Sequence, residues 1–389
     1  MAPRRHIAST TGVNPPLICL LCGMELPYTG SSGIADTHEP NQILKQQWKK
    51  SWGVYHVMVP SREVEESDFG NFLRIWSCLC RVIIKESDTK YRLTGINILK
   101  HSAESPYYTP NDPEMARIGG RKGADPDKVG GKRINRYDNG DFTEFYGASI
   151  GRQPSQYKGK VVGYIIHASC WVLFNRVEGL KLKEAKLAKL VQVCRKHWRK
   201  NTMWRLYDNN VHFVQPRQDL LQYEYGCDIY QNPLVPKVQQ ALDCADVESL
   251  RQSKGRISSR SSNIPLEVAI LIAEWVCPVK HTLKDIKNTG NMLLVFGWNL
   301  PDWFWQRRLD EGLFIELDKL KKVTSPVGWQ LRLNLMCLVV GRTEFRSSSG
   351  LASRERVLKS ILALEKTYLT LESAKEKALI EKGKKNDSQ

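Results

Sequence analysis

Residues 264–276 predict a short helix that is apolar on almost every face, and this segment constrains the fold more than any other part of the chain. Asn263 can cap this helix, and Pro265 falls in the first turn, where backbone amides have no intrahelical partner. Only Glu267 and Glu274 are charged, so the polar stripe is narrow. The other large side chains are Leu266, Val268, Ile270, Leu271, Ile272, Trp275 and Val276. Such a helix requires burial on more than one side.

Two interpretations of this helix stay open. In the first, the helix lies wholly within the core of its own domain, as it would in a structural scaffold. In the second, one face packs on its own domain and a partner protein covers the other. Strong protection of residues 264–276 from hydrogen exchange in the isolated chain would favour the core.

The beginning of this segment, Ile264-Pro265-Leu266-Glu267, resembles the start of an F-box, whose usual form is Leu or Ile, Pro, any residue and Glu before an aliphatic helix. A second apolar segment follows at 293–298. Residues 299–318 and Trp329 then resemble the Leu-Pro, Trp, Arg and acidic pattern that follows the F-box in many fungal F-box-like proteins. The resemblance covers residues 262 to 340.

The resemblance implies an adaptor of an SCF-type ubiquitin ligase. In such a protein the F-box helices dock on a Skp-type adaptor of a cullin ligase, and the rest of the chain holds a substrate protein. No covalent chemistry would then belong to this chain, so we do not expect an enzyme. Short helices with apolar faces suit such an interface, in which Trp and aliphatic side chains act as anchors. The contact is expected at Pro265, Leu266, Ile270 and Leu271.

Two short cysteine motifs could form the halves of a metal site. Cys19 and Cys22 belong to a Cys-x-x-Cys-Gly knuckle, in which Gly23 lets backbone amides turn toward thiolate sulfurs. One knuckle supplies half of a tetrahedral site. His167 and Cys170 are three residues apart at a predicted helix start, so they lie on one face and could supply the other half.

The pairing of these halves rests mainly on the resemblance, because fungal F-box-like proteins combine such a knuckle with a His-x-x-Cys-Trp segment like the one that ends at Trp171. It implies one structural zinc ion, since four protein ligands leave no position for a reactive water. Two alternatives stay open. The four residues can be reduced core residues, and Cys78-Leu79-Cys80 is a rival second half, although side chains at i and i+2 of a strand can equally be small core residues.

Composition restricts the class of protein. The 389 residues are 41% apolar, which suffices for packed cores, and the ten cysteines show no dense paired framework, as is typical of a reducing compartment. We find no secretory signal, and the longest apolar stretch, 161–174, is too short to span a bilayer. We therefore expect an intracellular protein, cytoplasmic or nuclear. The net charge of +17 indicates attraction to nucleic acid, anionic lipid or an acidic partner.

A basic amphipathic helix provides the main competing function. Nine Lys or Arg and one Glu lie between residues 180 and 205, with apolar residues at helical spacing on one face. The helix could bind nucleic acid, with Lys196, Arg199 and Lys200 on phosphates and Trp198 and Trp204 stacked on bases. An acidic membrane surface, a calmodulin-type partner, or simple packing by the apolar face are the alternatives.

We predict an α+β fold that is mostly helical, with a mixed, Cys-containing N-terminal domain and a helical F-box-like region. Helices are expected at 179–202, 233–251, 264–276 and 353–382, strand or mixed structure at 50–59 and 73–84, and a strand entering a helix at 160–166. The expected domain plan is a flexible tail at 1–14, a Cys-containing domain at 15–178 with a loop at about 102–135, a basic helical segment at 179–251, a linker at 252–262, an F-box-like region at 263–310, a C-terminal helical part at 311–371 and a charged tail at 372–389.

Overall fold

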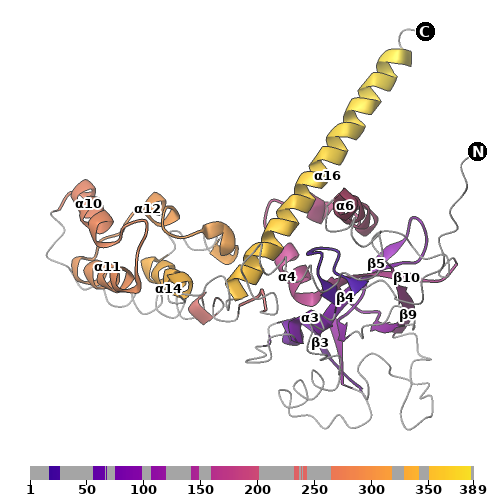
Figure 1. Cartoon of the computed structure of the whole chain (residues 1–389), viewed down its shortest axis with the longest axis horizontal. Coiled ribbons are helices and arrows are strands. Elements are labelled where there is room, and N and C mark those ends of the chain that lie inside the picture. Colours follow the sequence, from indigo (N-terminus) through magenta and orange to yellow (C-terminus); the bar gives the residue numbers. More distant parts are fainter. Residues whose placement is uncertain are drawn as a thin grey trace, which may run out of the picture.

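The chain folds as an α+β body beside a group of helices, and the long helix α16 (Gly350–Asn386) begins between the two and projects away (Figure 1). This fold class confirms the prediction from sequence. No helix of the described residues is long and apolar enough to cross a membrane. The computed structural model describes residues 17–26, 56–65, 67, 75–98, 107–119, 142–148, 159–200, 232–235, 238, 240–242, 264–317, 328–340 and 350–386.

A six-stranded sheet forms the centre of the body, in the order β5-β4-β10-β9-β7, with β6 paired to β4. The central strand β10 runs antiparallel to β4 and parallel to β9. Both β4 and β10 are buried along nearly their whole length, which explains their almost unbroken apolar sequences. The strands are β4 (Leu79–Lys85), β5 (Tyr91–Leu93), β6 (Asn97–Ile98), β7 (Tyr107–Pro110), β9 (Phe142–Gly147) and β10 (Val162–His167).

Smaller elements surround this sheet. An antiparallel pair joins β3 to β8, and a short hairpin joins β1 to β2. Residues 56–59 of the predicted segment 50–59 are strand. Within 73–84, the described residues 75–84 form a short helix followed by β4, and 160–166 contains most of the strand β10, which enters helix α4 as predicted. The elements are β1 (Leu17–Ile18), β2 (Glu25–Leu26), β3 (His56–Pro60), α2 (Ser61–Glu65), α3 (Ile75–Cys78), β8 (Met115–Gly119) and α4 (Ala168–Arg176).

The basic segment forms two helices, α5 (Lys181–Glu184) and α6 (Leu187–Lys200), where the sequence predicted one. Ala185 has an extended backbone and ends α5. The carboxylate of Glu365 in α16 accepts hydrogen bonds from the first two backbone amides of α5, and thereby caps this short helix. Of the helix predicted at 233–251, the described residues are 233–235, 238 and 240–242; the first three form a turn and not a helix, and the other four are helical.

The helical group contains α10 (Leu266–Val276), α11 (Leu283–Phe296), α12 (Asp302–Gln306), the 3-10 turn η2 (Glu311–Leu313) and α14 (Trp329–Val340). Helix α10 is the apolar helix that the sequence predicts at 264–276. Helix α11 contacts α10 and α14, and it begins with a capping box of Thr282 and Asp285. Its C-terminal residue is followed by Gly297, whose left-handed backbone ends the helix.

One apolar face of helix α16 packs back onto the body, against α4 and α6. Val357, Ile361 and Leu364 on this face are fully buried. The first turns of α16 also contact the helical group, because Arg354 donates to both carboxylate oxygens of Glu316 at 2.6 and 2.5 Å. Arg176, at the end of α4, donates to the same carboxylate at 3.4 Å. Glu316 therefore connects the helical group to both α4 and α16.

We predict that the contact between α6 and α16 weakens in acid because of His197. Its Nδ1 atom lies 3.0 Å from the hydroxyl of Thr367, and burial lowers the pKa of His197 below its ordinary value. The unfolded chain regains the ordinary pKa of about 6.5, so below this pH it binds more protons than the folded chain. Stability is therefore fully present at higher pH and falls as the pH drops below this value.

Urea unfolding of the wild type between about pH 7.5 and about pH 5.5 should show a steeper loss of stability than unfolding of His197→Gln. Thr367→Val, which keeps the imidazole, serves as the control and should retain the wild-type dependence on pH. Equal pH dependence of the wild type and His197→Gln would contradict this account.

Candidate metal centre

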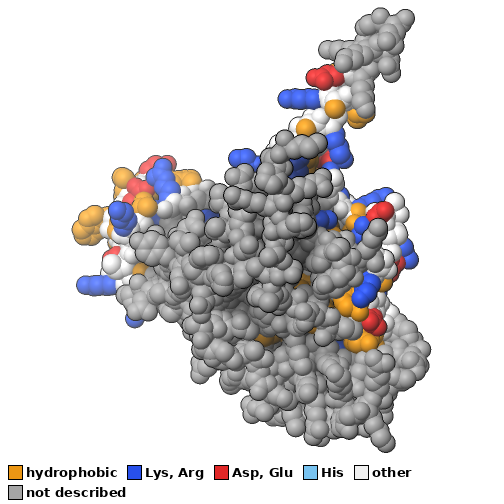
Figure 2. Space-filling view, turned by 45° about the vertical axis from the view of Figure 1, so that its right-hand side comes forward, with side chains coloured by type: hydrophobic (Ala, Val, Ile, Leu, Met, Phe, Trp, Pro, Cys, Tyr) orange, Lys and Arg blue, Asp and Glu red, His pale blue; other side chains and the backbone are white. Residues whose placement is uncertain are grey.

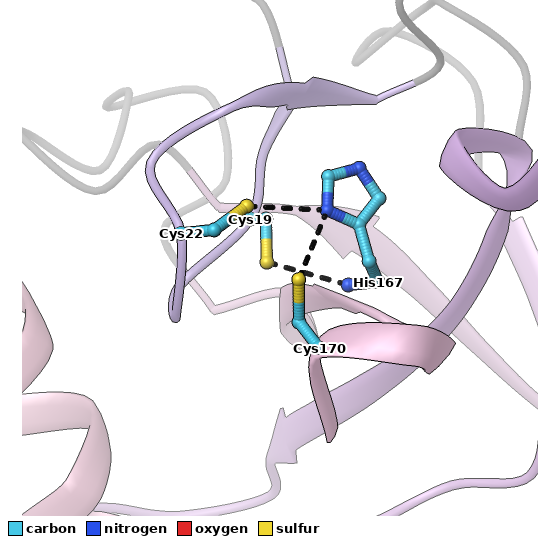
Figure 3. Close-up of side chains that lie close together, drawn as sticks. All are labelled: Cys19, Cys22, His167 and Cys170. Atoms are coloured by element: carbon cyan, nitrogen blue, oxygen red, sulfur yellow. Dashed lines mark hydrogen bonds between the residues drawn. The ribbon is translucent and has the colours of Figure 1, made fainter. Parts of the chain in front are cut away.

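Four side chains from two distant parts of the chain meet at one buried point (Figure 3). Cys19 and Cys22 lie in the turn of the β1–β2 hairpin, His167 is the last residue of β10, and Cys170 lies in the first turn of α4. Their ligand atoms all lie within 4.8 Å of one another, and all four residues are buried. The structure thus brings together the four residues proposed from the sequence as a metal site.

The imidazole of His167 points its Nδ1 atom at the sulfurs. This nitrogen lies 3.4 Å from the Cys22 sulfur and 3.7 Å from the Cys170 sulfur, and the His167 backbone amide donates to the Cys19 sulfur at 3.3 Å. Sulfur and nitrogen ligands of a tetrahedral ion lie about 3.5 to 3.8 Å apart, given metal–ligand bonds of about 2.0 to 2.3 Å. The donor set and its spacing therefore fit a metal ion.

The electrostatics of the cluster favour ionisation of the Cys22 thiol over the other two thiols. Burial raises the pKa of the Cys19 and Cys170 thiols well above the ordinary value. Burial acts in the same direction on Cys22, but hydrogen bonds with Cys170 and Cys19, together with the nearby His167, hold the pKa of Cys22 well below its ordinary value. A bound cation would stabilise the other two thiolates as well, which is why metal binding at such a site releases protons.

The knuckle that carries Cys19 and Cys22 is fixed by backbone hydrogen bonds. The Cys19 amide donates to the Met24 carbonyl at 2.8 Å, and the Gly23 amide donates to the Cys19 carbonyl at 2.9 Å. Gly23 adopts a left-handed backbone with φ of 72°, which favours glycine. The Leu20 amide donates to the carbonyl of Ile165 in β10 at 2.8 Å. This last bond holds the knuckle against the strand that leads to His167.

The other face of the cluster is covered by an aromatic side chain. The ring of Trp76 in α3 lies 4.7 Å from that of His167, measured between centroids, at an interplanar angle of 53°. The Nε2 atom of His167, on the far side of the ring from the sulfurs, is buried and has no hydrogen-bond partner. The imidazole is therefore held by its contact with the indole and by its position at the end of β10.

The structure corrects the expectation that Trp198 stacks on nucleic-acid bases. Trp198 is buried, and its indole Nε1 donates to the carbonyl of Leu20 in the knuckle at 2.7 Å. Lys196 is exposed. The side chains of Arg199 and Lys200, and the whole of Trp204, lie outside the described part of the chain. The described portion of the basic helix thus packs by its apolar face, and its Trp198 indole supports the knuckle of the Cys/His cluster.

The rival cysteine pair does not join the cluster. Cys80 lies in β4, and its thiol donates to the backbone carbonyl of Asn97 at 3.3 Å. Cys78 belongs to helix α3, so the two cysteines are not on one strand as the spacing suggested. The expectation that these two cysteines form the second half of the site is therefore wrong.

Helix α10 exposes most of the residues expected to bind a partner. Pro265, Leu266 and Leu271 are exposed, whereas Ile270 is half-buried against the core of the helical group. Three further large side chains of α10 are exposed and were not among the residues expected to bind: Val268, Ile272 and Trp275.

A signal for this orientation was present in the sequence. Ala269 and Ala273, four residues apart, are the buried residues of α10. Small side chains at this spacing let a helix approach its neighbour closely, so they mark the inner face. The large apolar side chains on the opposite side are then the ones left exposed.

Comparison of the chain with protein-family models, with curated proteins and with solved structures gives no match. We therefore infer its function from the geometry of the Cys/His cluster and of helix α10.

We predict that Gly23→Ala destabilises the chain more than Gly179→Ala does. Both glycines have left-handed backbones, with φ of 72° and 73°, so alanine meets the same backbone strain at each. A Cβ at Gly23 would also lie 2.6 Å from the Trp198 ring, whereas a Cβ at Gly179 would meet nothing within 4 Å. The extra loss at Gly23, about 1 to 3 kcal/mol, is the effect of forcing the indole away from the knuckle. Urea unfolding measures the difference, and equal losses would refute this role of Trp198.

Proposed function

We propose that the chain is a non-enzymatic, F-box-like adaptor that binds a Skp-type protein through helix α10 and thereby joins a cullin ubiquitin ligase. The α+β body would then hold a substrate protein. The observation that supports this proposal is a stripe of large apolar side chains on the outer face of α10. The stripe consists of Val268, Leu271, Ile272 and Trp275.

The stripe has the geometry of a helix that docks in a partner's groove. Its members are spaced i, i+3, i+4 and i+7, so they form one face, opposite the buried Ala269 and Ala273. Leu271 is 64% exposed and Trp275 is 87% exposed. Exposed Trp beside aliphatic residues is the composition expected of the centre of an interface. A helix that served only its own core would turn these side chains inward.

Neighbouring residues extend the apolar surface beyond α10. Val279 and Leu283 follow it in the chain, and Leu294 and Val295 lie near the end of α11, all exposed. In Figure 2 hydrophobic side chains gather at the outer end of the helical group, with charged side chains beside them. Large exposed apolar side chains gathered at one end of a molecule are typical of an interaction site. A partner that contacts more than one helix, as an F-box partner does, fits this arrangement.

We further propose that the metal at the Cys/His cluster is zinc, with a structural role. Three thiolates and one imidazole are ligands that suit zinc. All four positions around the ion would be filled by protein, which leaves none for substrate or water. The ion would join the β1–β2 hairpin to β10 and α4, and so hold the N-terminal segment on the body. This role agrees with an adaptor that performs no chemistry itself.

The purified chain should contain about one zinc ion per molecule after dialysis against metal-free buffer. Replacing Cys19 and Cys22 together by Ser removes two of the four ligands, so this variant should lose the zinc. Cys78→Ser is the matched control, because Cys78 lies outside the cluster and should leave the zinc content unchanged. Elemental analysis by mass spectrometry measures the ratio. A folded wild-type preparation without metal would reject zinc.

The adaptor proposal predicts that Leu271→Ala combined with Trp275→Ala weakens binding to a purified Skp-type protein by at least about tenfold. Both side chains are exposed, so the variant should unfold at nearly the wild-type temperature. Leu379→Ala is the matched control, since Leu379 is similarly exposed but lies in the projecting part of α16. Isothermal titration calorimetry measures the affinities. No binding by the wild type, or equal binding by the double variant, would rule out this interface.

A further inference from the structure

One buried arginine lies against the metal centre and is not explained by the packing around it. Arg356, in the first turns of α16, is 3% exposed, and its Nη1 donates to the carbonyl of Cys22 at 3.4 Å. Its Nε and Nη2 atoms are buried and have no hydrogen-bond partner. A guanidinium is always charged, and burying it without full pairing is unfavourable. A negative charge nearby would stabilise an arginine buried in this way.

The metal-bound cluster would carry that charge. A divalent ion has two positive charges, whereas three thiolates contribute three negative charges and a neutral imidazole contributes none. The loaded centre is thus a buried monoanion. Its sulfurs are shielded from water, because all four ligand residues are buried. A buried net charge is unfavourable unless an opposite charge lies close by, and Arg356 contacts the knuckle that supplies two of the three sulfurs.

Arg354, two residues earlier, provides an instructive contrast. It is also fully buried, but its guanidinium donates to the carboxylate of Glu316 and not to the knuckle. Two buried arginines on the same turns of α16 therefore face two different anionic groups. For Arg354 that group is the carboxylate of Glu316, and for Arg356 it would be the set of thiolates that a bound metal holds together.

We propose that Arg356 is the counter-ion of the metal centre, and that it makes the docking of the first turns of α16 depend on the bound metal. This inference rests on the proposed zinc site. Later turns of α16 have contacts of their own, because Glu372 pairs with Lys189 at 2.6 Å and Thr367 bonds His197. Loss of the metal should therefore loosen α16 near residues 352–360 and leave the region around 367–372 docked.

The first test is the zinc affinity of variants, measured by competition with a chromogenic chelator on chains shown by circular dichroism to be folded. Arg356→Gln removes the charge and should weaken zinc binding by about 10- to 100-fold, the usual effect of losing a group that supports metal ligands. Arg356→Lys keeps the charge and should restore part of the affinity. Arg354→Gln, the matched control, should change the affinity by less than about twofold, because it removes an equally buried guanidinium that faces Glu316.

The second test is hydrogen exchange of the whole wild-type chain with zinc bound and after its removal by a chelator. We expect faster exchange at 352–360 in the metal-free chain, and a smaller change at 367–372. If the wild type binds zinc and Arg356→Gln binds it with the same affinity, the role of Arg356 is overturned and the zinc site stands. If Arg356→Gln does not fold, the absence of any exchange difference at 352–360 between the zinc-bound and zinc-free wild type would overturn it. A wild type that binds no zinc would overturn the zinc site and this inference together.

Discussion

The contact between the Cys19–Cys22 knuckle and the junction of β10 with α4 is the interaction on which the rest of the structure depends. The Leu20 amide donates to the carbonyl of Ile165 in β10, and the His167 amide donates to the Cys19 sulfur. These two hydrogen bonds hold the β1–β2 hairpin on the body without the help of a metal ion. Two helices then attach to the carbonyls of the same knuckle, α6 through Trp198 and α16 through Arg356. A few residues near the N-terminus thereby bring together segments that are far apart in the sequence.

Apolar side chains serve two different purposes in the two parts of the molecule. In the sheet, β4 and β10 are apolar because both of their faces are covered. In α10 the inner face is made of small residues, Ala269 and Ala273, and the larger side chains point outward. Size, and not hydrophobicity alone, thus decides which face of a nearly uniformly apolar helix packs on the fold. The outer face remains available for a partner.

Elements set by local patterns could be predicted from the sequence, whereas contacts between distant segments could not. The transition from β10 to α4 and the existence of α10 and α16 follow from periodicity and from Pro265. The two halves of the metal site are separated by about 145 residues, so spacing identified each half but a resemblance was needed to pair them. The spacing of residues in the basic helix does not reveal that the Trp198 indole bonds the carbonyl of Leu20, 178 residues away.

The junction at Glu316 connects the Cys/His cluster to the helical group that carries α10. Helix α4 has Cys170 in its first turn and Arg176 in its last, so a single rigid element extends from the cluster to this carboxylate. Arg354 reaches the same carboxylate from α16. Hydrogen bonds from two guanidiniums to one carboxylate restrict the relative orientation of the helices more than a contact between apolar surfaces does, because donors and acceptors must align. The ionic junction therefore sets the direction in which the helical group, with α10 at its outer end, extends from the body, while the surrounding apolar core supplies most of the stabilisation.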